Sequence, residues 1–407
     1  MFRHLPPTAT PLPLTTLLRA WPAGTAATEQ FRTALQAYLG VPRCDLAASG
    51  RTALYLLLRA LQATADHPDR RAVVLPAYTC PAVAKVVLDV GLQPYLVDII
   101  PTTLAFDLDR LAAAVSEQTL AVIHVHPFGM PLDLAPVQSL AQAAGAVVIE
   151  DAAQALGAKV GGRPVGTVGE YGLFSLGPGK ALSTGGGGIL SANTPAALQR
   201  LTQGQSTWPP LPASGATPAL LRLALFTLAF QPPLWWLATR LGAQRVGKHE
   251  ASWGYRLRGL TPMQAAVGLA QLPRLDAYNQ HRRQTAQLLD AELQGIAGVQ
   301  LFSCSGGGVQ GNEDDKCNEP IYLRFPLSVH DQARREQLFQ RLWAAGIGVG
   351  RMYQRTLAEI FPQLAVGHYP GAQVVAQGLL TLPTHHFVTE QDVVRIGQIF
   401  SAGKSQS

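Results

Sequence analysis

Three residues between positions 146 and 190 have the types and the spacing that cofactor chemistry needs. Residues 146–149 are a short apolar run typical of a buried parallel strand, and Asp151 stands just beyond it, at the end where open α/β sheets bind ligands. Ser175 lies near the end of a second short strand, and Lys180 follows five residues later on a glycine-rich loop. A lysine amine can form a Schiff base, a carboxylate can keep a pyridine nitrogen protonated, and a hydroxyl can bind phosphate. Together these residues suggest pyridoxal phosphate (PLP).

Each of these residues taken alone has an ordinary structural interpretation. A lysine in a glycine-rich loop is usually a solvated surface residue, and an aspartate after a strand is often only the N-cap of a helix. The combination of Asp151, Ser175 and Lys180 in this order along the chain favours a cofactor site over unrelated surface positions.

Longer motifs surround these residues. They are 150–155 (EDAAQA), 174–176 (FSL) with Lys180 after it, and 184–188 (TGGGG). With these motifs the sequence resembles the DegT/StrS-type sugar aminotransferases, which are fold-type I PLP-dependent enzymes. The resemblance implies an α/β fold with a mostly parallel central sheet flanked by helices, and a smaller C-terminal α+β domain. We expect a large PLP-binding domain over residues 1–250 and a small domain over residues 251–407.

The same resemblance implies roles for single residues. Lys180 would carry the cofactor and move the proton, while Asp151 would hold the ring nitrogen protonated. Gln154 would reach the ring hydroxyl, and Ser175 would bind the phosphate. His126 matches a strand-end histidine near the cofactor or the substrate, although a histidine in such a place is more often structural.

A second part of the phosphate site is expected at residues 49–52. Ser49 and Gly50 form a small-residue turn that opens an apolar helix, and the free N–H groups and the dipole of a helix start attract anions. The family has Ser-Gly-Thr here, so Arg51 takes the position of the family threonine and Thr52 follows it. Backbone binding survives this change, and the Arg51 guanidinium can add to it. The alternative is an ordinary capped helix.

Two positions depart from the family pattern. Cys80 stands where the family has an aromatic residue that stacks on the pyridine ring, so either its sulfur packs on the ring or Tyr78 provides the aromatic surface. A buried, unreactive thiol is the competing interpretation of Cys80. Residues 257–259 (LRG) stand where the family has Asn-Tyr-Arg, whose asparagine reaches the phosphate site of a partner subunit.

The resemblance implies an aminotransferase that moves an amino group from glutamate to a nucleotide-linked keto-sugar. Such an enzyme would serve the synthesis of amino sugars or cell-surface polysaccharides and would work as a homodimer. One alternative is another PLP chemistry on a sugar or a lipid-linked substrate. The family's dehydratases carry histidine in place of the lysine, so Lys180 favours transamination. A second alternative is a non-catalytic regulatory protein that has the PLP-enzyme fold and acts at a membrane.

Composition excludes several other classes of protein. The chain has 407 residues, of which 47% are hydrophobic and 14% charged, as in a globular protein with a large core. Its net charge of +6 is scattered and includes no dense Lys/Arg run, so we expect no nucleic-acid partner. The four cysteines lack zinc-ligand spacing, so we expect no metal and reduced thiols. No signal peptide is evident, which predicts a cytoplasmic protein.

Residues 206–241 form an apolar insertion that the family pattern lacks. The helical stretch 219–230 is too short for a hydrocarbon core of ~30 Å. We expect the insertion to be buried at a subunit interface or to lie on a membrane surface, and Trp236 beside Arg240 suits the second. Residues 1–22 are punctuated by prolines and predict an arm or a loop.

Overall fold

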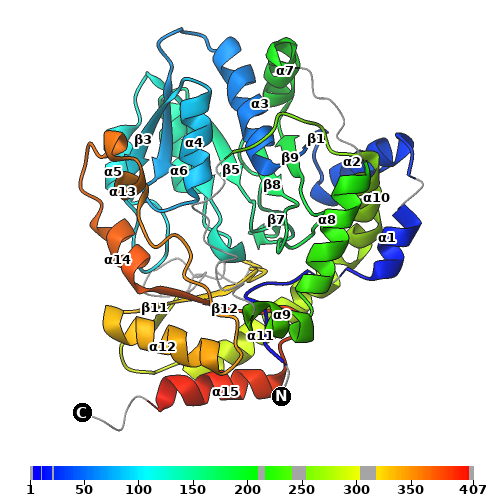
Figure 1. The fold of residues 1–407 in the computed structure, drawn as a ribbon. Coiled ribbons are helices and arrows are strands. Elements are labelled where there is room, and N and C mark those ends of the chain that lie inside the picture. The colour runs from blue at the N-terminus through cyan, green and yellow to red at the C-terminus, as the bar shows by residue number, and fades with distance from the viewer. Residues whose placement is uncertain are drawn as a thin grey trace.

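The computed structural model describes residues 3–10, 12–20, 23–209, 216–240, 254–302 and 318–402. Its centre is a sheet of seven strands in the order β1-β9-β8-β5-β4-β2-β3 (Figure 1). Neighbouring strands pair in parallel except at β9, which runs against both β8 and β1. The mostly parallel sheet that the sequence predicts is therefore confirmed. Its strands are β1 (Arg43–Ala47), β2 (Ala72–Pro76), β3 (Gln93–Val97), β4 (Thr119–Val125), β5 (Val147–Asp151), β8 (Tyr171–Ser175) and β9 (Gly188–Ala192).

Helices surround this sheet and a smaller one, and two further short strands, β6 and β7, pair with each other. The short strands are β6 (Lys159–Val160) and β7 (Arg163–Pro164). The helices are α1 (Leu14–Ala20), α2 (Ala26–Leu39), α3 (Gly50–Ala63), α4 (Pro81–Asp89), α5 (Leu108–Ala114), α6 (Ala135–Ala143), α7 (Pro195–Gly204), α8 (Ala216–Ala229), α9 (Pro232–Arg240), α10 (Pro262–Gln271), α11 (Leu275–Leu293), α12 (Gln332–Ala344), α13 (Leu357–Ile360), α14 (Pro370–Gly378) and α15 (Glu390–Ser401).

Alternate residues of the central strands point to opposite faces of the sheet, as the period of two in a strand requires. Val147 and Ile149 of β5 pack in the apolar cluster that includes α3 and α4, whereas Val148 packs in the cluster that includes α5 and α6 (Figure 1). Helices therefore cover both faces. This double burial explains why the strands read as continuous apolar runs in the sequence.

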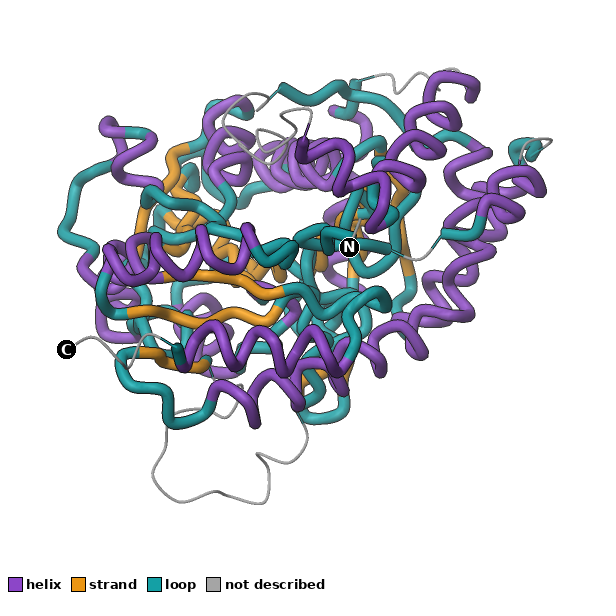
Figure 2. Tube along the Cα trace, turned by 60° about the horizontal axis from the view of Figure 1, so that its bottom comes forward, coloured by secondary structure: helices purple, strands orange, loops and turns teal. Residues whose placement is uncertain are grey.

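The C-terminal part has its own antiparallel sheet, in the order β10-β11-β12, and it comes forward in Figure 2. Its strands are β10 (Val299–Leu301), β11 (Phe325–Val329) and β12 (Leu379–Leu382). Helices α11, α12 and α15 pack on this sheet through one apolar cluster, which confirms the predicted smaller α+β domain. The boundary predicted at residues 250 and 251 lies outside the described residues.

Two strands of this domain differ from the sequence prediction. The pattern predicts a strand over 320–325, but β11 begins only at Phe325, because the preceding segment pairs with the large domain instead. The N–H of Ile321 donates to the carbonyl of Gly129 at 2.8 Å. The pattern also predicts a strand over 346–349, but the structure has none there, and only the next residue, Gly350, forms a bridge, with Thr381.

The sequence predicts an arm or a loop over residues 1–22, and the structure confirms this for residues 3–10 only. Residues 3–10 run without helix or strand, but α1 follows them, because Leu17 packs against Met263 and Val267 of α10. Leu5 is fully buried in the apolar cluster of the C-terminal domain, and its N–H donates to the carbonyl of Gly346 at 2.8 Å. The arm is therefore fastened to the C-terminal domain at its start.

Helices α8 and α9 form an apolar hairpin within the insertion 206–241. On its inner side Leu223 packs in the same cluster as α1 and α10. On its outer side lie five leucines with 40–61% of their surface exposed, which are Leu221, Leu225, Leu228, Leu234 and Leu237. Within the described ranges no helix is long and apolar enough to cross a membrane.

Candidate active site

The residues predicted for a cofactor site come from neighbouring strands at one edge of the central sheet. Asp151 ends β5, Ser175 ends β8, and His126 directly follows β4. Cys80 is the N-cap of α4, which follows β2, and Ser49 is the N-cap of α3, which follows β1. Since these strands are parallel, their carboxyl ends meet at the same edge, where sheets of this kind bind ligands.

Asp151 and Lys180 lie close enough to change each other's ionisation. Burial lowers the pKa of Lys180, and the charge of Asp151 opposes this shift. Burial also raises the pKa of Asp151, against a hydrogen bond from the Ala153 N–H at 3.0 Å and the charge of Lys180. A carboxylate and an amine, both only partly exposed, thus lie in one site.

The loop that carries Lys180 is held by the N-terminal arm. The Thr8 hydroxyl donates to the carbonyl of Gly179 at 2.9 Å, and the Thr10 hydroxyl donates to that of Lys180 at 2.6 Å. Gly179 has a φ of 73°, and a Cβ on it would lie 2.3 Å from Cγ2 of Thr8. Only glycine fits this position, because both its backbone conformation and its close contact exclude a side chain.

The start of α3 lies against the end of β8, which brings the two halves of the predicted phosphate site together. A Cβ on Gly50 would lie 3.7 Å from Cβ of Ser175. Gly188, at the start of β9, packs so tightly on this turn that a Cβ there would lie 2.4 Å from the Gly50 nitrogen. The glycine run of the sequence therefore lets the backbone approach the helix start.

The hydroxyls of Ser49 and Thr52, at the start of α3, already have hydrogen-bond partners within the protein. Ser49 Oγ accepts a hydrogen bond from the Thr52 N–H at 3.1 Å, and the Thr52 hydroxyl donates to the carbonyl of Arg256 at 3.0 Å. The positive charge of Arg51 acts on Tyr255, whose pKa it lowers against the larger effect of burial. The groups left for an anion at this turn are main-chain amides and the Ser175 hydroxyl.

Cys80, at the start of α4, lies close to Tyr353 of the C-terminal domain. Burial raises the pKa of the Cys80 thiol and that of the Tyr353 hydroxyl, and each group also shifts the pKa of the other. Tyr353 has a φ of 46°, which is strained for a residue other than glycine. Tyr78 packs edge-on against Tyr353 at 5.8 Å between ring centroids, and its hydroxyl donates to the carbonyl of Met352 at 2.6 Å.

His126 is held by Glu150, a fully buried carboxylate. Its Nδ1 accepts from the Leu132 N–H at 3.1 Å, so its Nε2 carries the proton and donates to Glu150 at 3.0 Å. Burial disfavours the charge of Glu150, but hydrogen bonds from His126 and from the amides of Gly166 and Gly169 outweigh it and lower its pKa. Both ring nitrogens of His126 therefore have protein partners, which leaves its ring face for other contacts.

Sequence reasoning placed Gln154 in the site and missed Arg324. Gln154 is half-buried in the turn that follows Asp151. Arg324 immediately precedes β11, and its charge lowers the pKa of Lys180. No local motif marks Arg324, because the fold brings it to Lys180 from the other domain.

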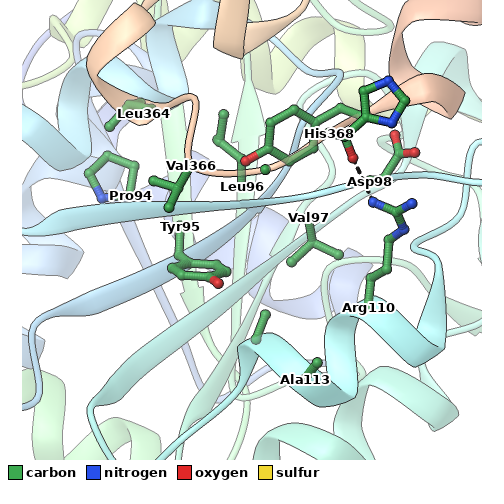
Figure 3. A pocket seen from close by; sticks show the side chains of 13 residues that line it. Pro94, Tyr95, Leu96, Val97, Asp98, Arg110, Ala113, Leu364, Val366 and His368 are labelled. Atoms are coloured by element: carbon green, nitrogen blue, oxygen red, sulfur yellow. Dashed lines mark hydrogen bonds between the residues drawn. The ribbon is translucent and has the colours of Figure 1, made fainter.

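A separate hollow of about 200 Å³ lies beside β3, the outermost strand of the sheet (Figure 3). Arg110 donates to the carbonyl of His368 across it, and Asp98 accepts from the N–H groups of Gly371 and Ala372 at the start of α14. Its lining includes none of the predicted cofactor residues. The hollow therefore lies where residues 364–369 pack against β3 and α5 of the large domain.

The residues at the carboxyl edge fit PLP. An acid and an amine lie in one site, and a helix start with a glycine-lined approach stands beside Ser175. This combination on a mostly parallel sheet with a smaller α+β domain defines a fold-type I PLP-dependent enzyme.

Comparison with known proteins specifies the family. The model of the DegT/DnrJ/EryC1/StrS aminotransferase family matches residues 15–401, and the chain belongs to this family of PLP-dependent aminotransferases. The chain is 29% identical, over 86% of its length and 82% of the relative, to the UDP-N-acetyl-3-dehydro-alpha-D-glucosamine 3-aminotransferase of Acidithiobacillus ferrooxidans. It is 27% identical to the GDP-perosamine synthase of Caulobacter vibrioides, over 90% and 87% of the two chains.

A solved structure shows the same arrangement. The sugar aminotransferase CalS13 from Micromonospora echinospora superposes with a TM-score of 0.74 at 27% identity, covering 98% of this chain and all of the other. The fold is thus shared over nearly the whole chain, the small domain included.

Proposed function

We propose that this enzyme transfers an amino group from glutamate to a nucleotide-linked keto-sugar, in the synthesis of amino sugars or cell-surface polysaccharides. The observation that carries this proposal is the shared site of Asp151 and Lys180. The names of two relatives support the acceptor, because one is an aminotransferase of a UDP-linked dehydro-sugar and the other is a GDP-perosamine synthase.

Each residue of the proposed site has a separate role in transamination. When bound, PLP accepts the electron pair left at the α-carbon of the donor. Lys180 moves the proton away from that carbon, and its lowered pKa keeps more of the amine unprotonated and ready to act as a base. Asp151 holds the proton of the ring nitrogen. Gln154 orients the ring through its hydroxyl, while residues 49–52 and Ser175 bind the phosphate.

Half-reactions test this function directly. The purified, PLP-loaded enzyme is mixed with L-glutamate, and we expect the visible absorption of the cofactor to disappear as 2-oxoglutarate forms. A nucleotide-linked keto-sugar added after removal of the glutamate restores that absorption. If no amino acid bleaches the cofactor, the proposal is wrong.

The two alternatives give other outcomes. Another PLP chemistry, on a sugar or a lipid-linked substrate, would consume substrate without forming 2-oxoglutarate. A non-catalytic regulatory protein would turn over no keto-sugar at all. Lys180 and Asp151, in one site, favour transamination over both.

We also propose that the enzyme is a cytoplasmic homodimer in which the outer face of the hairpin α8–α9 is covered. Five leucines of this hairpin are 40–61% exposed, and a gathering of exposed apolar side chains often marks a contact site. A second copy of the chain is the occupant that we favour. Peripheral contact with a membrane is the alternative, and Arg240, which lies 5.5 Å from the ring of Trp236, suits it.

A further inference from the structure

Helix α8 of the insertion packs on the lysine loop, by which we mean residues 176–187, between β8 and β9. The helix runs alongside α10 (Figure 1), and its Leu223, which is 2% exposed, lies against Gly185, five residues after Lys180. A Cβ on Gly185 would lie 3.1 Å from Cβ of Leu223 and 3.0 Å from its Cδ1. The two residues are therefore so close that no side chain fits between them.

The lysine loop depends on its neighbours for its shape. Gly185, Gly186 and Gly187 have positive φ angles of 73°, 155° and 139°. A glycine backbone changes conformation easily, and this run has no side chains of its own to hold it. One amide of α10 fastens it, since Nε2 of Gln264 donates to the carbonyls of Thr184 and Gly186 at 3.2 and 3.0 Å. Leu223 of α8 is the apolar contact that completes this support.

The stretch between Gly185 and Lys180 is short and packed. Its four residues, 181–184, are 0–5% exposed. A protein interior of this density transmits a displacement instead of absorbing it. A shift of the backbone at Gly185 is therefore expected to reach Lys180.

The hairpin α8–α9 also reaches the lysine loop by a second route. The carbonyl of Pro232, the first residue of α9, accepts a hydrogen bond from the N–H of His4 at 3.3 Å. From His4 the N-terminal arm runs to the loop, where the Thr10 hydroxyl donates to the carbonyl of Lys180. The hairpin thus supports the loop directly beyond the lysine and, through the arm, at the lysine itself.

We propose that Leu223 is a positioning residue for Lys180, because its contact with Gly185 fixes the shape of the glycine run and with it the place of the lysine amine. This inference rests on the proposed role of Lys180 in transamination. Misplacing a catalytic group by about 1 Å can slow a reaction about 100-fold, so a loosened loop is expected to be slow. The insertion then serves the reaction through its inner side, apart from whatever covers its outer face.

Leu17 of α1 provides a matched control for Leu223. It belongs to the same apolar cluster and is 4% exposed, so its truncation also leaves a cavity in that cluster. None of the glycines of the lysine loop has Leu17 among its nearest neighbours. The two leucines therefore share their burial and differ in their contact with the loop.

Hydrogen–deuterium exchange of the PLP-loaded enzyme, without substrate, tests the contact itself. We expect the amides of peptides covering residues 176–187 to exchange about 10-fold faster in Leu223→Ala than in the wild type, and at the wild-type rate in Leu17→Ala. Leu223→Met, which keeps the volume, should exchange as the wild type does. Thermal melting shows whether the two alanine variants are folded and similarly destabilised. If Leu223→Ala does not fold, Leu223→Val, which removes less, takes its place.

Stopped-flow bleaching by glutamate tests the consequence for the reaction. Its amplitude reports how much of the enzyme is folded and loaded, whereas its rate constant reports how the lysine is placed. We expect the rate constant at saturating glutamate to fall about 10-fold to 100-fold in Leu223→Ala, with the amplitude and the half-saturating glutamate concentration unchanged. Leu223→Met should restore the rate, and Leu17→Ala should keep it.

Three results would overturn the proposal. They are unchanged exchange of the lysine loop in Leu223→Ala, faster exchange with an unchanged rate constant, and equal effects of Leu223→Ala and Leu17→Ala on both measurements. The last of these would give Leu223 a structural role only. If glutamate bleaches neither the wild type nor any variant, the proposed function fails, while the exchange measurement still decides whether Leu223 holds the loop.

Discussion

Thr10 binds the backbone of Lys180, 170 positions away in sequence: its hydroxyl donates to the lysine carbonyl at 2.6 Å. Thr8 binds the carbonyl of the preceding residue, Gly179, in the same way. Upstream, Arg3 forms two hydrogen bonds with Asp392 of the C-terminal domain, at 2.7 and 2.9 Å. The arm therefore connects the loop of Lys180 to the C-terminal domain.

Replacing Thr10 by valine tests whether this tie positions Lys180. The hydrogen bond is lost while the shape is kept, so we expect a loss of stability of only about 1 kcal/mol. The rate of the glutamate half-reaction should fall more than this, because a small displacement of a catalytic group slows the reaction strongly. Stopped-flow bleaching and urea denaturation measure the two effects. Thr10→Ser, which keeps the hydroxyl, should behave as the wild type, and equal losses in both variants would contradict the idea.

Lys180→Ala should lose the visible absorption that depends on a bond between lysine and cofactor, and with it transamination. Asp151→Asn is the matched variant, since it keeps Lys180 and removes the charge at the ring nitrogen. We expect Asp151→Asn to keep visible absorption but to bleach with glutamate at least ~100-fold more slowly, as for loss of a positioned proton-holding group. Absorption spectra of the purified variants measure both results, and a coloured Lys180→Ala enzyme would refute its role.

These two residues were predictable because their signal is local. Asp151 follows an apolar run that reads as a strand, and Ser175 and Lys180 stand at a fixed spacing after the next one. The parallel sheet then brings those strand ends together. The small-residue turn at residues 49–52 was predicted from another local signal, the start of an apolar helix, and it lies beside Ser175.

Other features of the site depend on packing between distant segments. Arg324 is one of many scattered arginines in the sequence, and only the docking of the C-terminal domain brings it to Lys180. The proximity of Tyr353 to Cys80 has the same origin. The segment before Phe325 looks like a strand, yet it pairs with the large domain, because periodicity cannot tell which partner a segment finds.

Glu150 should make the fold sensitive to acid. Its pKa is lowered below the ordinary value of 4.5, so its charged form stabilises the folded state above that value, and this stability is lost as the pH falls through the lowered pKa. Glu150→Gln replaces one accepting oxygen by a donor that faces other donors, and we expect it to cost about 2–3 kcal/mol at neutral pH. Urea denaturation from pH 7 to 3 should show a shallower pH dependence in Glu150→Gln than in the wild type. Parallel curves would show that Glu150 is not responsible.

The outer face of the hairpin α8–α9 gives the last prediction. Leu225 and Leu237 are 58% and 47% exposed, on different helices of this face. If a second copy of the chain covers the face, the double variant Leu225→Glu/Leu237→Glu should turn a dimer into a monomer, because two buried charges have no partners. Sedimentation velocity measures this change. Val374→Glu, at a position of similar exposure on α14, is the control and should leave the dimer intact. A dimeric double variant that no longer floats with anionic vesicles, when the wild type does, would assign the face to the membrane instead.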